Sequence, residues 1–142
     1  MLDRERILAK VDELSGYLGE LQQVIPKSFA EYRAKLAERR ACERILQLSI
    51  ECMTDICGLF VSGLRLGLPA QEDDLFEKLG RAKVLSPNLA EMLKTMKGFR
   101  NILVHEYGGI DDVIVYKVAT TRVGDLEAFK VAILRAVEEK SK

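Results

Sequence analysis

Residues 42–60 of the chain read Cys-Glu-Arg-Ile-Leu-Gln-Leu-Ser-Ile-Glu-Cys-Met-Thr-Asp-Ile-Cys-Gly-Leu-Phe. Apolar residues recur in this stretch at helical spacing, but they cover more than one face of the helix, as in a helix that packs on two sides. These residues are Ile45, Leu46, Leu48, Ile50, Met53, Ile56, Leu59 and Phe60. The stretch therefore predicts an all-α protein, and its additional apolar face would suit the interface of a homodimer.

The sequence on either side of this stretch has the same helical periodicity, and 142 residues suffice for one core but not for two. We therefore expect a single domain, residues 1–142, folded as an up-and-down bundle of about five helices. The first expected helix has an apolar stripe from Ile7 to Ile25 and is ended by Pro26, and the second runs from about Ser28 to Leu66. A short third helix has Glu72-Asp73-Asp74 at its positive end, a fourth begins at Ser86-Pro87-Asn88, and a last runs from about Arg122 to Glu139.

One segment, residues 113–118, is ambiguous. Its β-branched residues favour a strand, but the sequence nearby offers no strand with which it could pair. We predict that it is helical.

Composition excludes several classes of protein. Basic and acidic residues balance at 22 each, so the chain lacks the overall positive charge of a general nucleic-acid binder. No segment early in the sequence combines basic residues with an apolar run, and no run of about 20 apolar residues is present. We therefore expect a cytoplasmic protein that does not enter a membrane. Cys42, Cys52 and Cys57 lack the spacing of a zinc site, so we interpret them as reduced core thiols and expect neither a metal nor a cofactor.

The sequence Arg-Asn-Ile-Leu-Val-His-Glu-Tyr, residues 100–107, contains the only histidine of the chain. An imidazole both accepts and donates protons near neutral pH, and a guanidinium can stabilise the added charge of a pentavalent phosphorus. His105 and Arg100 are thus candidates for phosphodiester chemistry, with Asn101 in a supporting role because it shares a helical face with His105. On one ideal helix Arg100 and His105 point about 140° apart. A second copy of the motif across a two-fold axis would bring the groups together.

A simpler interpretation stays open, because a single histidine in the last turn of a helix often only interacts with the helix dipole. Two charge patterns bear on the choice. Lys94, Lys97 and Arg100 recur every three residues and form a basic edge along which RNA phosphates could lie. In the second helix Glu43, Gln47, Glu51 and Asp55 recur every four residues, which is usually only a solvated face. If this line faces the motif, Glu51 or Asp55 could orient His105 or pair with Arg100.

Residues 98–107, Gly-Phe-Arg-Asn-Ile-Leu-Val-His-Glu-Tyr, followed by Ile110-Asp111, resemble the Arg-x4-His-x-Tyr motif of HepT-like proteins in the HEPN superfamily. Residues 41–51 of the second helix, Phe76, Leu79 and the order of the helices extend the resemblance over most of the chain. It implies an all-helical homodimer that acts as a metal-independent ribonuclease toxin, with both motifs lining a shared cleft. It also favours a helix at residues 113–118.

The resemblance further implies a partner, a nucleotidyltransferase antitoxin of the MntA type, which would silence the toxin by transferring AMP from ATP to the motif tyrosine, here Tyr107. From the residues alone, the preferred interpretation of Tyr107 is a phenol that packs or forms a hydrogen bond in the cleft and is never modified. The alternative to an RNA endonuclease is a non-catalytic helical dimer that binds a nucleotide or docks a nucleotidyltransferase.

Overall fold

The fold is all-α, as the sequence predicts. The computed structural model describes residues 1–105 and 109–140, and these hold seven helices rather than about five. Their bounds are α1 Arg4–Val24, α2 Phe29–Ala34, α3 Leu36–Gly63, α4 Asp73–Arg81, α5 Pro87–His105, α6 Asp112–Thr121 and α7 Val123–Lys140.

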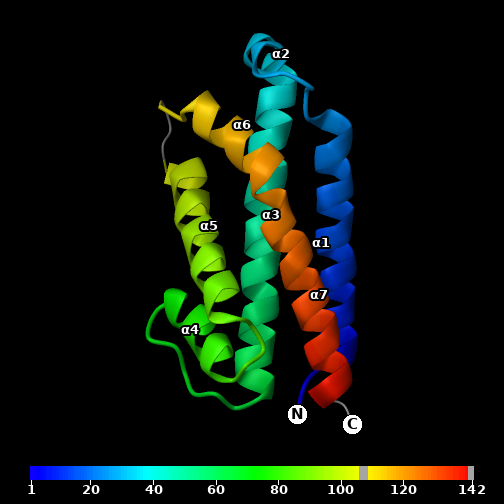
Figure 1. Cartoon of the computed structure of the whole chain (residues 1–142), viewed down its shortest axis with the longest axis vertical. Helices are drawn as coiled ribbons and strands as arrows, with labels where there is room; N and C mark the ends of the chain where they lie inside the picture. The colour runs from blue at the N-terminus through cyan, green and yellow to red at the C-terminus, as the bar shows by residue number, and fades with distance from the viewer. Residues whose placement is uncertain (106–108, 141–142) are drawn as a thin grey trace.

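Helix α3 is the centre of the bundle (Figure 1). It contacts α1, α2, α4, α5 and α6, and in the view of Figure 1 it runs between α1 and α5. Of the eight apolar residues named above in the stretch 42–60, six are buried, and Leu48 and Leu59 are partly buried. Neighbouring helices of the same chain thus cover most of the additional apolar face, and its use in a dimer interface stays a prediction.

By length and composition α3 could also cross a membrane. However, 56% of its most apolar 18-residue window is buried inside the bundle, which is how the core helix of a globular domain reaches the same hydropathy. We interpret α3 as a core helix.

The predicted second helix, from about Ser28 to Leu66, is broken at Lys35, whose φ of −111° and ψ of 94° are not helical. Neither proline nor glycine marks the break, which tertiary contacts hold in place. The ring of Tyr32 in α2 is fully buried and stacks against Phe29, while Tyr116 of α6 packs on both rings. Arg39 donates a hydrogen bond to the carbonyl of Arg33, which the break leaves without a helical partner.

The other boundaries follow the sequence signals. Helix α1 ends just before Pro26, and the Ser86 hydroxyl accepts a hydrogen bond of 3.1 Å from the backbone N–H of Leu89 at the start of α5. Residues 113–118 lie within α6, so the prediction of a helix there is confirmed. The tertiary partners of α6 are the helices α2, α3 and α7.

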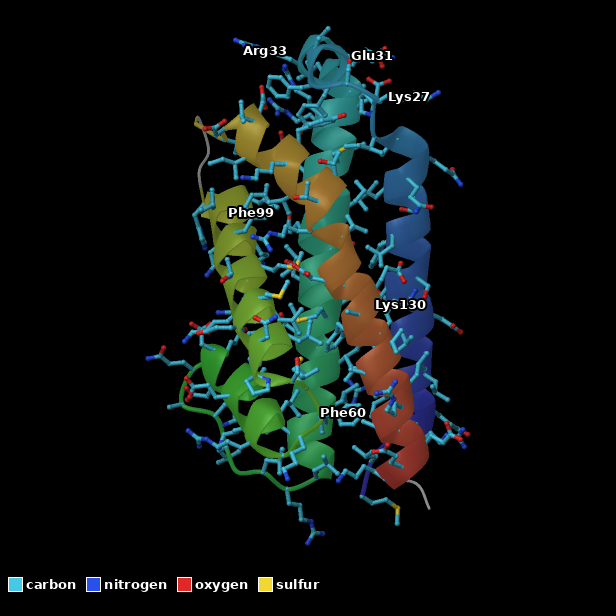
Figure 2. All side chains as sticks on the ribbon, viewed as in Figure 1. Lys27, Glu31, Arg33, Phe60, Phe99 and Lys130 are labelled. Carbon is cyan, nitrogen blue, oxygen red and sulfur yellow. The ribbon has the colours of Figure 1, made fainter. Side chains whose placement is uncertain are left out.

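Figure 2 shows the side chains that fill the space between the helices, among them Phe60 of α3 and Phe99 of α5, both buried. At the α2 end of the bundle the labelled side chains of Lys27, Glu31 and Arg33 are exposed. The two chain termini lie at the opposite end (Figure 1). Because α5 runs antiparallel to α3, its last turn points towards the α2 end (Figure 1).

Candidate functional site

Helix α5 carries the described part of the motif and is anchored by its apolar residues. Leu93, Met96 and Phe99 are buried against the core, which fixes the rotation of the helix about its axis. Arg100, the next residue, then lies at the edge of the contact with α3 and is partly buried. His105 ends the helix and is exposed.

Arg100 is tied to α3 by Glu51. Its Nε and Nη2 atoms both donate to Oε2 of Glu51, at 3.1 and 2.8 Å. Gln47, one turn earlier on α3, donates to the same oxygen at 3.2 Å. Three donors thus converge on one carboxylate oxygen, and the guanidinium is held in a fixed orientation on the side of α5 that faces α3.

The same contacts determine the protonation of Glu51. Its partial burial opposes ionisation, but hydrogen bonds from Arg100 and Gln47, together with the positive charges of Arg100 and Arg44, outweigh that effect. The pKa of Glu51 is therefore lower than the ordinary value of 4.5. At neutral pH the pair is a carboxylate and a guanidinium.

The guanidinium keeps hydrogen-bonding capacity for a ligand. Of the five N–H bonds of an arginine, Arg100 uses two on Glu51 and one on Oδ1 of Asn101, at 3.3 Å from Nη1. One N–H on each Nη atom has no acceptor in the part of the chain that the structure describes. Two such donors match the oxygens of a phosphate.

One chain does not bring Arg100 and His105 together. Because α5 stays helical through His105, the two side chains keep the divergence of about 140° expected from their spacing. Among the described residues, none forms a hydrogen bond or an ion pair with His105, and Asn101 bonds to Arg100 instead. The motif of a single chain presents an anchored arginine and a separate, exposed imidazole.

The four polar residues that recur every four positions on α3, Glu43, Gln47, Glu51 and Asp55, do not share one partner. Glu43 pairs with Arg40 of the same helix at 2.9 Å, and Asp55 pairs with Lys10 of α1 at 3.3 Å. Of the two carboxylates considered for the motif, Asp55 therefore contacts α1 instead of α5, whereas Glu51 pairs with Arg100, which is one of the roles considered for it.

The basic edge of α5 has intramolecular partners. Lys97 lies 3.4 Å from Glu72 and 3.3 Å from Asp73, and its side chain is only 15% exposed. Lys94 lies 3.9 Å from Glu77 of α4. These contacts attach α4 to α5, and an RNA phosphate would have to compete with them.

Other sequence predictions have different outcomes. Tyr107 lies outside the described residues, so its contacts stay unassigned. Cys42, Cys52 and Cys57 are free and buried, as predicted for core thiols. Burial raises the pKa of the Cys42 and Cys52 thiols to about 11, so neither is a thiolate at neutral pH. In the described part of the chain no cluster of three histidine, cysteine or acidic residues could hold a metal.

Sequence reasoning gave Gln47 no role, yet its amide completes the support of Glu51. The spacing of four residues between Gln47 and Glu51 on one helix was a usable signal, because residues four apart share a face. Lys10 was also missed, and nothing in its local sequence indicates the contact with Asp55 forty-five residues away.

The chain is similar to known ribonucleases over most of its length. The family model described as ribonuclease HepT-like matches residues 14–133. A tRNA nuclease HepT from Aphanizomenon flos-aquae is 31% identical over 105 residues, which are 74% of this chain and 71% of that protein. An mRNA nuclease HepT from Shewanella oneidensis is 27% identical over 123 residues, which are 87% of this chain and 92% of that protein.

A solved structure has the same fold. It is the tri-AMPylated HEPN toxin of Shewanella oneidensis in complex with its MNT antitoxin, and it is 27% identical to this chain with a TM-score of 0.85. The alignment covers 95% of this chain and 99% of that one.

We predict that the contribution of Glu51 to stability depends on pH. Its folded-state pKa is lowered, so the stabilisation is present above the unfolded-state value of about 4.5 and disappears as the pH falls through the lower folded-state value. Both partners are about one-third exposed, and we expect Glu51→Gln to lower the free energy of unfolding at pH 7 by no more than about 1 kcal/mol. Urea unfolding at pH 7 and pH 3 measures this loss.

Glu91→Gln is the matched control, since Glu91 is an exposed glutamate of α5 without an ion pair among the described residues. A loss for Glu51→Gln that is equal at both pH values, or equal to that of the control, would contradict the prediction.

Proposed function

The chain belongs to the HepT-like ribonuclease family, and from this premise we propose that it is a metal-independent endoribonuclease toxin of a toxin–antitoxin pair. The observation that carries the proposal is the guanidinium of Arg100. Glu51 holds it in place, and two of its N–H bonds have no acceptor within residues 1–105 and 109–140 and are available to a phosphate. The exposed His105 at the end of the same helix supplies a group that transfers protons at neutral pH.

The proposed reaction uses the ribose 2′-hydroxyl as the nucleophile. An imidazole takes the hydroxyl proton as the oxygen attacks the adjacent phosphorus, and Arg100 stabilises the charge of the pentavalent phosphorane. The bond to the 5′-oxygen then breaks, and that oxygen receives a proton from a general acid. The products end in a 2′,3′-cyclic phosphate and a 5′-hydroxyl. DNA lacks the 2′-hydroxyl and is not cleaved.

The active form in this proposal is a homodimer with both motifs in one cleft. The divergence of Arg100 and His105 on one chain supports it, because a two-fold partner would place a second imidazole and a second guanidinium opposite the first pair. One His105 would then act as base and the other as acid. Three exposed apolar side chains suit such an interface. Ile102 lies within the motif and is 47% exposed, and Val113 and Ile114 on α6 are 57% and 48% exposed.

The proposed partner is a nucleotidyltransferase antitoxin of the MntA type, which transfers AMP to Tyr107. The AMPylated Shewanella toxin with its MNT antitoxin supports this assignment by similarity. Tyr107 follows His105 by two residues, so an added AMP would bring a negative charge and a bulky base to the cleft. The modification would repel RNA and exclude it physically.

Within this proposal the protein acts in the cytoplasm, where RNA is its substrate. Lys94 and Lys97 stay candidates for contacts to RNA phosphates, in competition with the acidic residues of α4 and the segment before it. The tRNA nuclease and mRNA nuclease among the relatives make both classes of RNA reasonable first substrates.

We predict that the purified chain cleaves total cellular RNA in the presence of a chelator, and that His105→Ala and Arg100→Ala each lower the rate by about 100-fold or more. End-group analysis by mass spectrometry should find 2′,3′-cyclic phosphates. Arg6→Ala, an exposed arginine of α1, is purified identically and should keep its activity.

Equal cleavage by the wild type and His105→Ala would indicate a contaminating nuclease, and 5′-phosphate ends would contradict the mechanism. If neither protein cleaves any RNA offered, the non-catalytic dimer that docks a nucleotidyltransferase becomes the better account.

We also predict that incubation with an MntA-type nucleotidyltransferase and ATP raises the intact mass by one or more AMP units and abolishes cleavage. Tyr107→Phe should block both effects. Tyr17→Phe, which replaces a tyrosine on α1 bonded to Glu13, should block neither. Modification that persists in Tyr107→Phe would place the acceptor elsewhere.

A further inference from the structure

The lysines and arginines of α3 and α5 differ in how far their charge is neutralised within the chain. Five of the six pair with a carboxylate. The pairs are Arg39 with Asp112, Arg40 with Glu43, Lys94 with Glu77, Lys97 with Glu72 and Asp73, and Arg100 with Glu51. The sixth, Arg44, is exposed and has no ion pair or hydrogen bond with any residue in the described ranges 1–105 and 109–140.

The position of Arg44 on α3 relates it directly to the motif. Arg44 and Glu51 are seven residues apart, so their side chains leave the helix within about 20° of each other. Glu51 bonds to Arg100, and the face of α3 that carries Arg44 is therefore the face beside the motif. The positive charge of Arg44 also contributes to the lowered pKa of Glu51, which places the two groups within electrostatic reach.

The heights of these residues along the bundle agree with this placement. The Glu51–Arg100 pair fixes the register of the antiparallel helices α3 and α5. From that level Arg44 lies about 10 Å towards the α2 end, and His105 lies about 7 Å in the same direction, at 1.5 Å per residue. An extended RNA strand whose cleaved phosphate lies at Arg100 would therefore pass Arg44 if the strand runs towards the α2 end of the bundle.

An arginine that pairs with none of the described carboxylates suits a polyanion better than its neighbours on α3 and α5 do. A phosphate that binds Lys97 or Arg40 must displace a described carboxylate, whereas one that binds Arg44 displaces none of those in residues 1–105 and 109–140. The whole chain has no net charge, so attraction of RNA depends on such local positive charge.

We propose that Arg44 binds a backbone phosphate of the RNA substrate next to the cleaved one and so extends the site from α5 onto α3. This inference rests on the proposed nuclease function. It assigns Arg44 to substrate binding rather than to the reacting atoms, and its loss should weaken the binding of RNA and leave the chemical step intact.

The test measures RNA binding by fluorescence anisotropy in the His105→Ala background, where RNA is bound but not cut. The probe is a fluorescein-labelled single-stranded RNA of about 20 nucleotides of mixed sequence. We expect Arg44→Ala to raise the Kd about tenfold, and the slope of log Kd against log salt to fall by about 0.7, the value for one phosphate contact on a single strand. Arg44→Lys should retain most of the affinity, because it keeps the charge.

Arg6→Ala is the matched control, as it removes an exposed arginine from α1 and should change neither the Kd nor the slope. Arg44→Gln provides a second variant without the charge should Arg44→Ala fold poorly. An effect of Arg44→Ala and Arg44→Gln no larger than that of Arg6→Ala would overturn the inference.

Cleavage assays with His105 restored separate the remaining outcomes. A raised KM with an unchanged kcat supports a phosphate contact, whereas a lowered kcat with unchanged RNA affinity would overturn it and assign Arg44 to the orientation of Glu51 and Arg100. If the wild type cleaves RNA and Arg44→Ala and Arg44→Gln bind and cleave RNA as the wild type does, this inference is rejected and the proposed nuclease function is not. Absence of both binding and cleavage in the wild type rejects it together with the proposed nuclease.

Discussion

The burial of α3 is the constraint on which the structure depends. This helix must cover apolar side chains on more than one face, and the chain meets the requirement by packing α1, α4, α5 and the α2–α6 end around it. One consequence is that buried apolar residues hold α5 against α3. Glu51 and Arg100 meet at the edge of that apolar contact. There the hydrogen bonds from Arg100 and Gln47 favour the ionised carboxylate, and partial exposure leaves the arginine accessible.

In the proposed reaction, Arg100 and His105 meet two different requirements of phosphodiester chemistry. The charge stabiliser must be held rigidly, and Arg100 is held by three hydrogen bonds that engage Glu51 and Asn101. The proton-transfer group must reach the substrate, and His105 stands exposed at the last described turn of α5. Because one helix directs the two groups to different sides, a single chain holds the parts of the site without assembling it. A second copy is the most economical way to complete it.

Most of the fold could be predicted from local signals, since Pro26, the Ser86 cap and the helical periodicity each determine a boundary nearby. The break at Lys35 could not, because it depends on the packing of Tyr32 against Tyr116, which is 84 residues further along the chain. The site shows the same limit. Spacing identified Glu51 and Asp55 as candidate partners of the motif, but only the packing of α1 and α5 on opposite sides of α3 determines that Asp55 meets Lys10 while Glu51 meets Arg100. The partners of Lys97 depend on the placement of α4 in the same way.

The central claim, that two chains share one cleft, is tested most directly by titrating wild-type chains with a growing excess of inactive His105→Ala chains under conditions of subunit exchange. Pull-down through a tag on one of them verifies the mixed dimers. If one imidazole acts as base and the other as acid, mixed dimers are inactive, and RNA cleavage per wild-type chain should fall about tenfold at a tenfold excess. Cleavage that stays proportional to the amount of wild-type chain, with mixed dimers present, would contradict the account and show that each chain cleaves RNA with its own motif alone.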